Sequence, residues 1–221
     1  MSEPKKLVIE VFSDLVCPWC WIGDSRLQKA LQAEGLQEGK DVEVRWNPFQ
    51  LQPDRERDEK TLRQHLGEKY GSSRVDGMLS HVESVACEDG LCIRFDTVKN
   101  SPNTAQGHRL VLWVAQLVGG EKAIQVSRAL FSGYFEKGWD LNSDEDLLRA
   151  LEGTDLPKAD ARSFLSGTQA AEAVEQTQKQ AAAYGINGVP FFILGGKYAI
   201  SGAQPLEVFS RAIRQALTNP S

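Results

Sequence analysis

The pattern of hydrophobic and polar positions at the start of the chain predicts a strand, a helix and a second strand. The apolar run Leu7–Phe12 has the length and composition of a buried strand. Apolar side chains then recur at helical spacing from Pro18 to Glu34, and Gly35 is a typical residue just beyond a helix end. Apolar and charged residues alternate over residues 42–46, which is typical of a half-exposed strand. This part of the chain is therefore predicted to be β-α-β.

The middle of the chain has helical periodicity throughout. Ser101–Pro102 is a favourable pair for an N-cap and a first helical residue. Ser143 precedes three carboxylates, a pattern that stabilises the first turn of a helix. Helices are therefore expected at residues 61–70, 75–86, 102–118, 121–136, 144–152, 157–165 and 168–184.

Strand patterns return near the end of the chain. Phe191–Leu194 and Lys197–Ile200 flank Gly195–Gly196, which predicts a hairpin with a two-residue turn. Apolar residues at helical spacing then predict a terminal helix that opens at Gln204–Pro205. The last part is therefore predicted to be β-β-α.

Without the middle, the element order β-α-β followed by β-β-α is that of the thioredoxin fold. The chain has 221 residues and 41% of them are hydrophobic, so it is long enough for a small domain with an insertion. We predict an α/β fold in which residues 1–53 and 186–221 form a discontinuous thioredoxin-like domain. Residues 54–185 are predicted to form an all-helical insertion.

Charge and hydropathy exclude several classes of partner. The formal net charge is -5 and no basic run occurs, so neither nucleic acid nor an anionic membrane is an expected partner. The start, Met1–Lys6, leads into only six strand-like residues, which is too short for the core of a signal peptide. No apolar run approaches the length of a membrane span. We expect a cytoplasmic protein, in a compartment that keeps thiols reduced.

The strongest chemical signal is the motif Cys17-Pro18-Trp19-Cys20, directly after the first predicted strand. Pro18 suits the first turn of a helix, which places Cys17 at the helix N-terminus. Unpaired N–H groups and the helix dipole favour an anion there, and the thiolate is the nucleophilic form of cysteine. Cys20 is close enough to attack a mixed disulfide formed on Cys17. The motif therefore predicts thiol-disulfide redox chemistry.

Two other interpretations of this motif remain open. A C-x-x-C pair also occurs as half of a zinc site. It also occurs as a structural disulfide, which is disfavoured here because nothing indicates secretion. His65, His81 and His108 have no mutual spacing typical of a metal site, and no metal is predicted from them.

A second pair, Cys87 and Cys92, follows one of the predicted helices. On an unbroken helix the two residues would differ by roughly 140° and about 7.5 Å in rise, so they would not bond. Asp89–Gly90 is a turn signal between them, so the helix is expected to end there and let them approach. Three roles for Cys87 and Cys92 remain open: a redox relay, two buried packing thiols, and a zinc site shared with Cys17 and Cys20.

The chain resembles the DsbA family of the thioredoxin superfamily, and within it the cytoplasmic FrnE-type dithiol-disulfide proteins. The resemblance rests on the segments Phe12–Cys20, Gly185–Phe192 and Ile200–Gln204. It extends to the presence of a helical insertion between them. FrnE-type proteins include members with a second C-x4-C pair, which supports a relay through Cys87 and Cys92.

The resemblance also implies roles for individual residues. Cys17 is expected to be the attacking cysteine and Cys20 the buried resolving one. Val189–Pro190 matches the cis-proline segment that faces the active cysteines in the family. A cis bond there would turn the backbone of Val189 outward to pair with an extended substrate strand.

One departure from the family bears on the direction of electron flow. Strongly oxidising DsbA enzymes have a histidine beside the second cysteine, where this chain has Trp19. An indole offers an N–H but no positive charge, so the thiolate of Cys17 is expected to be less stabilised. We therefore expect a weaker oxidant that suits reduction or isomerisation.

The predicted function is a protein disulfide oxidoreductase or disulfide isomerase that acts on disulfide-bearing client proteins. No cofactor is expected beyond the redox-active disulfide, with glutathione or a thioredoxin-type protein as electron partner. One alternative is a glutathione-dependent transferase or a small-molecule isomerase, because kappa-class glutathione transferases and chromene-carboxylate isomerases share the insertion. Those enzymes have a serine where this chain has Cys17. The second alternative is a zinc-binding protein that uses both cysteine pairs.

Overall fold

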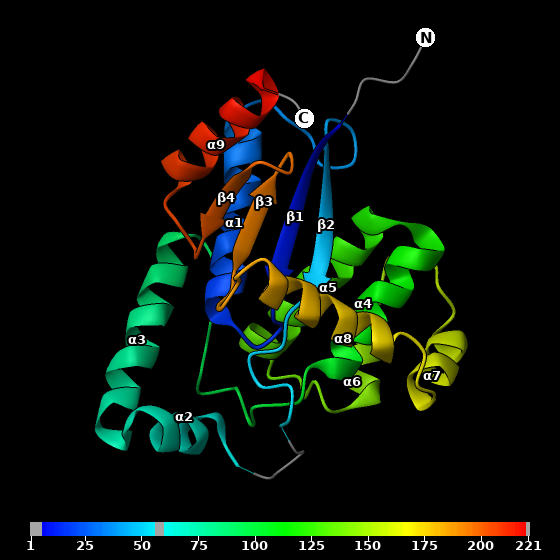
Figure 1. The fold of residues 1–221 in the computed structure, drawn as a ribbon. Helices are drawn as coiled ribbons and strands as arrows, with labels where there is room; N and C mark the ends of the chain where they lie inside the picture. The colour runs from blue at the N-terminus through cyan, green and yellow to red at the C-terminus, as the bar shows by residue number, and fades with distance from the viewer. Residues whose placement is uncertain (1–5, 56–59, 220–221) are drawn as a thin grey trace.

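The computed structural model describes residues 6–55 and 60–219, and shows a four-stranded sheet surrounded by helices (Figure 1). The N-terminal segment of residues 1–5, part of the predicted insertion at 56–59 and the end of the chain at 220–221 lie outside the described residues. The elements are β1 (Leu7–Ser13), α1 (Pro18–Ala33), β2 (Val42–Pro48), α2 (Leu62–Tyr70), α3 (Ser72–Glu88), α4 (Ala105–Val118), α5 (Gly120–Lys137), α6 (Asp144–Arg149), α7 (Lys158–Ser166), α8 (Ala171–Ala183), β3 (Phe191–Leu194), β4 (Tyr198–Ser201) and α9 (Leu206–Thr218).

The predicted order of elements is confirmed. β1, α1 and β2 come first, β3, β4 and α9 come last, and the described elements between β2 and β3 are all helices. The sheet has the order β2-β1-β3-β4, with β1 parallel to β2 and antiparallel to β3. β1 therefore lies between β2 and β3, and the Cys17 motif follows directly after its C-terminal end.

Helices cover both faces of the sheet. Ile9 and Val11 of β1 share one buried cluster with residues of α1 and α9, such as Leu27 and Phe209. Phe12 lies in a second cluster with Ala181 of α8, on the opposite face. Figure 1 shows α8 crossing in front of the sheet and α1 behind it. The alternation of side chains along a strand explains why neighbouring residues of β1 serve different clusters.

The helical insertion is packed onto the active-site helix as well as on itself. Trp21 of α1 stacks on Phe131 and Phe135 of α5, with ring centroids 6.1 and 5.9 Å apart. One buried cluster contains Cys17, Cys20 and much of the insertion. Figure 1 shows α3 running alongside α1 on the other side from α5. The helix that carries the cysteines is thus held between two arms of the insertion.

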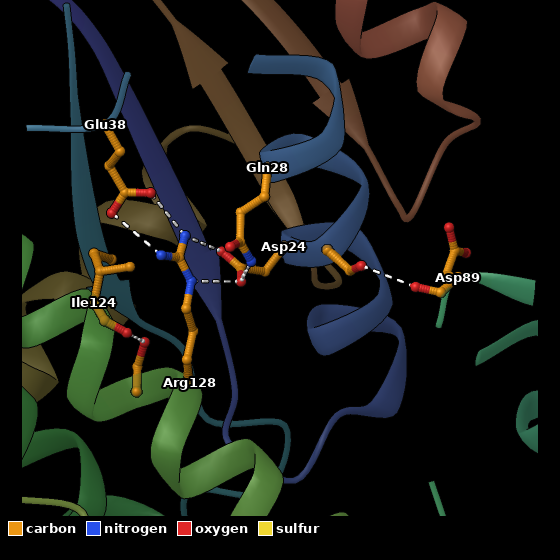
Figure 2. Close-up of polar contacts among 8 residues, drawn as sticks. Asp24, Gln28, Glu38, Asp89, Ile124 and Arg128 are labelled. Atoms are coloured by element: carbon orange, nitrogen blue, oxygen red, sulfur yellow. Dashed lines mark hydrogen bonds and ion pairs between the residues drawn. The ribbon is translucent and has the colours of Figure 1, made fainter. Parts of the chain in front are cut away.

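Two polar clusters hold α1 against these helices, and Figure 2 shows the contacts of Arg128 and one hydrogen bond to the carbonyl of Asp89. On one side, Arg128 of α5 binds Asp24 through Nε at 2.8 Å and also binds Glu38 at 2.8 Å. On the other side, Asp89 at the end of α3 binds Arg26 at 2.7 Å and its carbonyl accepts a bond from the Ser25 hydroxyl. Burial alone would lower the pKa of Arg128, but the carboxylates of Asp24 and Glu38 outweigh it and raise that pKa.

Loss of the Arg128 cluster is expected to destabilise the fold. Arg128→Met keeps the apolar stem but leaves Asp24, which is 8% exposed, without its cation. Removing one partner of a largely buried ion pair should lower the free energy of unfolding by about 2 kcal/mol. Urea unfolding measures this. Arg162→Met is the matched control, because its pair with Glu145 is largely exposed and should contribute less than ~1 kcal/mol. Equal losses in both variants would contradict the role of the cluster.

Several predicted helix limits are corrected. The helix predicted over 102–118 begins at Ala105, because the preceding residues make tertiary bonds instead of a first turn. Asn103 donates to the Arg55 carbonyl, and its side-chain oxygen accepts from the N–H of Ala105. The helix predicted over 144–152 ends at Arg149. Among the described residues, no helix has the length and apolar character needed to cross a membrane.

Candidate active site

Cys17 lies at the N-terminus of α1, as predicted. It is the N-cap residue, in an extended conformation, and Pro18 is the first residue of the helix. The Cys17 carbonyl accepts from the N–H of Cys20 at 3.0 Å and of Trp21 at 3.4 Å. The sulfur of Cys17 thus belongs to the residue that opens a 16-residue helix, at its positive end.

The two thiols of the motif are free and differ in their surroundings. Cys20 is 2% exposed and Cys17 is 5% exposed. Burial raises the pKa of the Cys20 thiol well above its usual range, and the adjacent Cys17 raises it further, against the opposing effect of Ser13 and Asp14. Cys20 therefore keeps its proton in the resting dithiol, which suits a thiol that acts second.

This difference predicts the order in which the four cysteines are alkylated. In the reduced native protein near neutral pH, Cys87 and Cys92 should react first because they are exposed. Cys20 should react at least about tenfold more slowly than Cys17, and faster as the pH is raised, because little thiolate forms at neutral pH when the pKa is raised. Timed labelling with iodoacetamide followed by peptide mass spectrometry measures the order. Equal rates at Cys17 and Cys20 would contradict it.

The segment Val189–Pro190 lies against the motif, and its peptide bond is cis. The thiol of Cys17 donates to the Val189 carbonyl, with the sulfur and oxygen 3.7 Å apart. A Cβ added to Gly23 of α1 would lie 3.0 Å from Pro190 Cγ, so glycine lets the helix approach this loop closely. The structure therefore brings together Cys17, Cys20, Val189 and Pro190, which lie at opposite ends of the sequence.

A buried pair beneath the motif was missed by the sequence analysis. Asp14, in the turn before Cys17, lies with its Oδ1 3.3 Å from Nε2 of His108 on α4, and both side chains are almost fully buried. The other carboxylate oxygen accepts from the N–H of Leu51, and the Asp14 carbonyl accepts from the N–H of Cys17. Asp14 therefore fixes the turn that presents Cys17. An acidic residue directly after a buried strand was the available signal.

A cavity of about 230 Å³ opens beside Cys17. Its walls come from the motif, from α2 and α3, and from the loop before α4. Most of the lining side chains are apolar, and Asp14, His65, Lys69 and Tyr70 are its titratable members besides Cys17. The apolar members include Val16, Trp19, Leu62, Leu66, Met78, Leu79, Val82, Phe95 and Pro102.

The remaining histidines of the sequence lie on helices of the insertion, as predicted. His65 is half-buried and contacts Gln52 at 3.0 Å as well as Arg55. His81 of α3 is exposed and its ring centroid lies 6.0 Å from that of Trp19. An imidazole therefore does lie near the motif, although it comes from the insertion.

The second cysteine pair lies where α3 ends. The predicted break is confirmed, because α3 ends at Glu88 and Gly90 has a φ of 74°. Cys87 and Cys92 are exposed free thiols, so the alternative of two buried packing residues is wrong. Asp89 between them is anchored to α1 through Arg26 and Lys29. Within residues 6–55 and 60–219, no three or more histidine, cysteine, aspartate or glutamate side chains are grouped to hold a metal ion.

Known proteins share the fold of this chain. The family model of the DSBA-like thioredoxin domain matches residues 8–214. The uncharacterised protein YwbO of Bacillus subtilis is 27% identical over 206 residues, which cover 93% of this chain and 94% of that protein. The crystal structure of a probable DsbA oxidoreductase from Streptomyces coelicolor superposes with a TM-score of 0.85 at 31% identity, covering 97% of this chain and 92% of the other.

Two more distant structures share the fold. The cytosolic disulfide reductase DsbM of Pseudomonas aeruginosa has a TM-score of 0.66 at 17% identity, over 96% of this chain and 98% of its own. A 2-hydroxychromene-2-carboxylate isomerase has a TM-score of 0.67 at 15% identity, over 95% and 96%. The fold alone therefore accommodates both disulfide chemistry and small-molecule isomerisation. With a family model that spans nearly its whole length, the chain belongs to the DSBA-like thioredoxin domain family.

Proposed function

We propose that this protein is a dithiol-disulfide oxidoreductase that acts on protein disulfides through Cys17 and Cys20. The observation that carries the proposal is the pair itself. One thiol opens helix α1 and faces the Val189 carbonyl, while the other is buried behind it with a raised pKa. A nucleophile paired with a protected second thiol is what a two-step exchange requires.

In the reducing direction, the thiolate of Cys17 attacks one sulfur of a client disulfide. A bond forms between Cys17 and that sulfur, and the other client sulfur leaves as a thiolate that takes up a proton. Cys20 then loses its proton and attacks the sulfur of Cys17, which releases the second client thiol. Two electrons pass to the client, and the protein is left with a Cys17–Cys20 disulfide.

The direction we propose is reduction or isomerisation, with glutathione or a thioredoxin-type protein restoring the dithiol. Trp19 supplies no charge beside Cys20, so the thiolate of Cys17 lacks the stabilisation that makes a strong oxidant. A cytoplasmic location fits this direction, since thiols are kept reduced there. DsbM is named as a cytosolic disulfide reductase and has also been solved with glutathione. Assignment to the FrnE-type subgroup is part of the same proposal.

Small-molecule isomerisation is the second candidate, because an apolar cavity adjoins Cys17 and an isomerase shares the fold. That chemistry has no use for Cys20, whose raised pKa and position behind Cys17 suit a resolving thiol. Glutathione dependence separates the two candidates. An isomerase should need glutathione for every turnover and should tolerate Cys20→Ser.

Reduction of insulin tests the proposed function. The dithiol protein is mixed with insulin, and NADPH oxidation is followed with either glutathione and its reductase or thioredoxin and its reductase. With at least one of these reductants, we expect the protein to increase the rate of insulin-dependent NADPH oxidation over the rate without the protein. The Cys20→Ser variant should lose this increase. Absence of turnover with both, in a folded protein with free Cys17 and Cys20, would contradict the proposal.

Electron exchange between the two cysteine pairs stays a prediction. Cys87 and Cys92 are exposed free thiols, whereas Cys17 and Cys20 are buried. Exchange needs direct contact of sulfur with sulfur, which a client, a second copy or a movement of α3 would have to provide. The double variant Cys87→Ser, Cys92→Ser should keep its fold but change the recovery of the Cys17–Cys20 dithiol by about threefold or more. Acid-quenched recovery kinetics and disulfide mapping measure this. Free thiols at every glutathione ratio, with unchanged kinetics, would show that the second pair has no redox part.

A further inference from the structure

We propose that Asn187 is a site of spontaneous deamidation, and that the isoaspartate formed there slows disulfide exchange at Cys17 by lengthening the main chain. Asn187 lies in the loop between α8 and β3, just before the Val189–Pro190 segment. The modification itself is independent of the proposed function, whereas its effect on exchange rests on that function. The protein thus loses activity as it ages, and the partner implied is a repair methyltransferase that recognises isoaspartate.

The residue after Asn187 favours this reaction. Deamidation starts when the backbone nitrogen of the next residue attacks the side-chain amide carbon of an asparagine, and asparagine is among the thermolabile residues for this reason. Glycine in the next position has no side chain to hinder the attack and leaves the backbone free to turn. Of the six asparagines in the sequence, Asn187 alone precedes glycine, and the others precede proline, serine or threonine. Asn187 is therefore the asparagine with the highest intrinsic reactivity.

The fold leaves both reacting groups accessible. Asn187 and Gly188 are exposed and belong to no helix or strand. Among the residues that the structure describes, none accepts a hydrogen bond from the Gly188 N–H, and none bonds to the Asn187 side chain. A Cβ added at Gly188 would lie more than 4 Å from every described residue other than its chain neighbours. Asn142 differs, because the N–H of the following Ser143 donates to the Asp140 carbonyl at 2.8 Å.

The reaction takes up water, releases ammonia and needs no other reagent. The nitrogen of Gly188 forms a bond to Cγ of Asn187, the bond from Cγ to the amide nitrogen breaks, and ammonia leaves with the proton from Gly188. The product is a succinimide ring, which water then opens. Cleavage of the ring bond to Cγ gives aspartate. Cleavage of the ring bond to the main-chain carbon gives isoaspartate, which is the major product of this chemistry.

Isoaspartate lengthens the main chain at a place where both neighbours are fixed. The main chain then runs through Cβ and Cγ, which adds about 1.5 Å. On one side, Ile186 is 3% exposed and its N–H donates to the Ala181 carbonyl. On the other side, Pro190 is buried and its carbonyl accepts from the N–H of Gly202 at 2.8 Å. The extra length must therefore be taken up within residues 187–189.

Val189 lies in this short stretch and faces the nucleophile. Its carbonyl oxygen lies 3.7 Å from the sulfur of Cys17 and accepts a hydrogen bond from the thiol. A displacement of about 1 Å breaks this contact and moves the backbone that we expect to pair with the client strand, and a misplacement of that size can slow a reaction by about 100-fold. Small thiol reagents do not use that backbone, so they should still reach Cys17.

The first measurement is the modification itself. The reduced protein and a synthetic peptide of residues 184–191 are incubated in the same mildly alkaline buffer with a thiol reductant, and isoaspartate is mapped by peptide mass spectrometry. We expect Asn187 in the protein to convert within about tenfold of the rate in the peptide, because few contacts restrain the loop. Asn142 should convert far more slowly, since the N–H after it is bonded. An intact Asn187 after the peptide has converted would overturn the site.

The second measurement is the effect on exchange. Fresh and aged protein are compared in insulin reduction under a thiol reductant. We expect the rate of the modified molecules to fall at least about tenfold. Treatment with a protein isoaspartyl methyltransferase and S-adenosylmethionine should restore the rate, because repair removes the extra main-chain atom. Full activity in protein that carries isoaspartate at position 187 would overturn the effect.

Two variants separate chain length from charge and from general ageing. Asn187→Gln keeps an exposed amide but would have to close a larger ring, so it should keep its rate through the same incubation. Asn187→Asp adds the negative charge without the extra atom, and should stay within about twofold of the fresh protein because water and salt screen an exposed charge. A loss in aged Asn187→Gln would overturn the assignment to Asn187. A tenfold loss in fresh Asn187→Asp would overturn the role of chain length.

The outcomes also separate this inference from the proposed function. If fresh protein does not reduce insulin, the proposed function fails, but the mapping of isoaspartate does not depend on activity. Alkylation of Cys17 by iodoacetamide then tests the displacement of Val189. We expect it to be about twofold or more faster in the modified protein, because the carbonyl no longer holds the thiol proton. An unchanged alkylation rate would overturn the displacement.

Discussion

Cys17→Ser is expected to abolish thiol-disulfide exchange, with a fall of at least ~10³-fold in the rate of insulin reduction. A serine hydroxyl at the N-terminus of α1 has the same position but does not form a disulfide. Exchange requires direct attack of sulfur on sulfur, and the buried Cys20 with its raised pKa is no substitute. Insulin turbidity under a thiol reductant measures the rate.

The companion variant distinguishes attack from resolution. Cys20→Ser should still form a bond between Cys17 and the client, but the bond should persist because no second thiol attacks it. Mixed disulfides should therefore accumulate on non-reducing gels and map to Cys17. Cys92→Ser is the control, because it replaces an exposed cysteine outside the motif. This variant should not accumulate mixed disulfides with the client. Near-normal turnover by Cys17→Ser would refute the assigned roles.

The largest expected effect on stability is that of Trp21→Ala, at about 3–5 kcal/mol in the free energy of unfolding. Trp21 is 6% exposed and stacks on both Phe131 and Phe135, so its removal opens a cavity between α1 and the insertion. Urea unfolding with circular dichroism measures the loss. Trp21→Phe keeps one ring in the stack and should lose clearly less. A loss below ~1 kcal/mol for Trp21→Ala would show that the insertion does not stabilise the active-site helix.

Patterns of local periodicity predicted the order of the elements well. Strands such as β1 and helices such as α1 are each defined by residues close in sequence, and Pro18 marks the start of α1 in both the sequence and the structure. The predicted start of α4 was wrong because the Asn103 side chain donates a hydrogen bond to the carbonyl of Arg55, which is 48 residues away. Hydrogen bonds between residues far apart in the sequence do not affect the local periodicity of hydrophobic residues, so that periodicity does not predict them.

The chemistry of the site was predictable only in part. Cys17 and Cys20 are visible as a motif, and the family resemblance points to Val189–Pro190. The contact between Asp14 and His108 joins residues 94 positions apart. The position of Asp14 directly after a buried strand was a signal for that residue, but nothing near either residue identifies His108 as its partner. The cavity is similar, because Met78 and Tyr70 meet the motif only through the way α2 and α3 fold back on α1. Such features depend on packing between elements, which spacing along the chain does not encode.

The redox equilibrium of Cys17 and Cys20 in glutathione buffers tests the proposed dithiol-disulfide chemistry directly. The protein is equilibrated at a series of ratios of reduced to oxidised glutathione, quenched in acid and mapped by mass spectrometry. We expect one two-electron transition to a Cys17–Cys20 disulfide, at a potential clearly below the value of about −120 mV for DsbA, where each 30 mV corresponds to a tenfold change in equilibrium. A pair that stays reduced at every ratio, or a potential near that of DsbA, would contradict it.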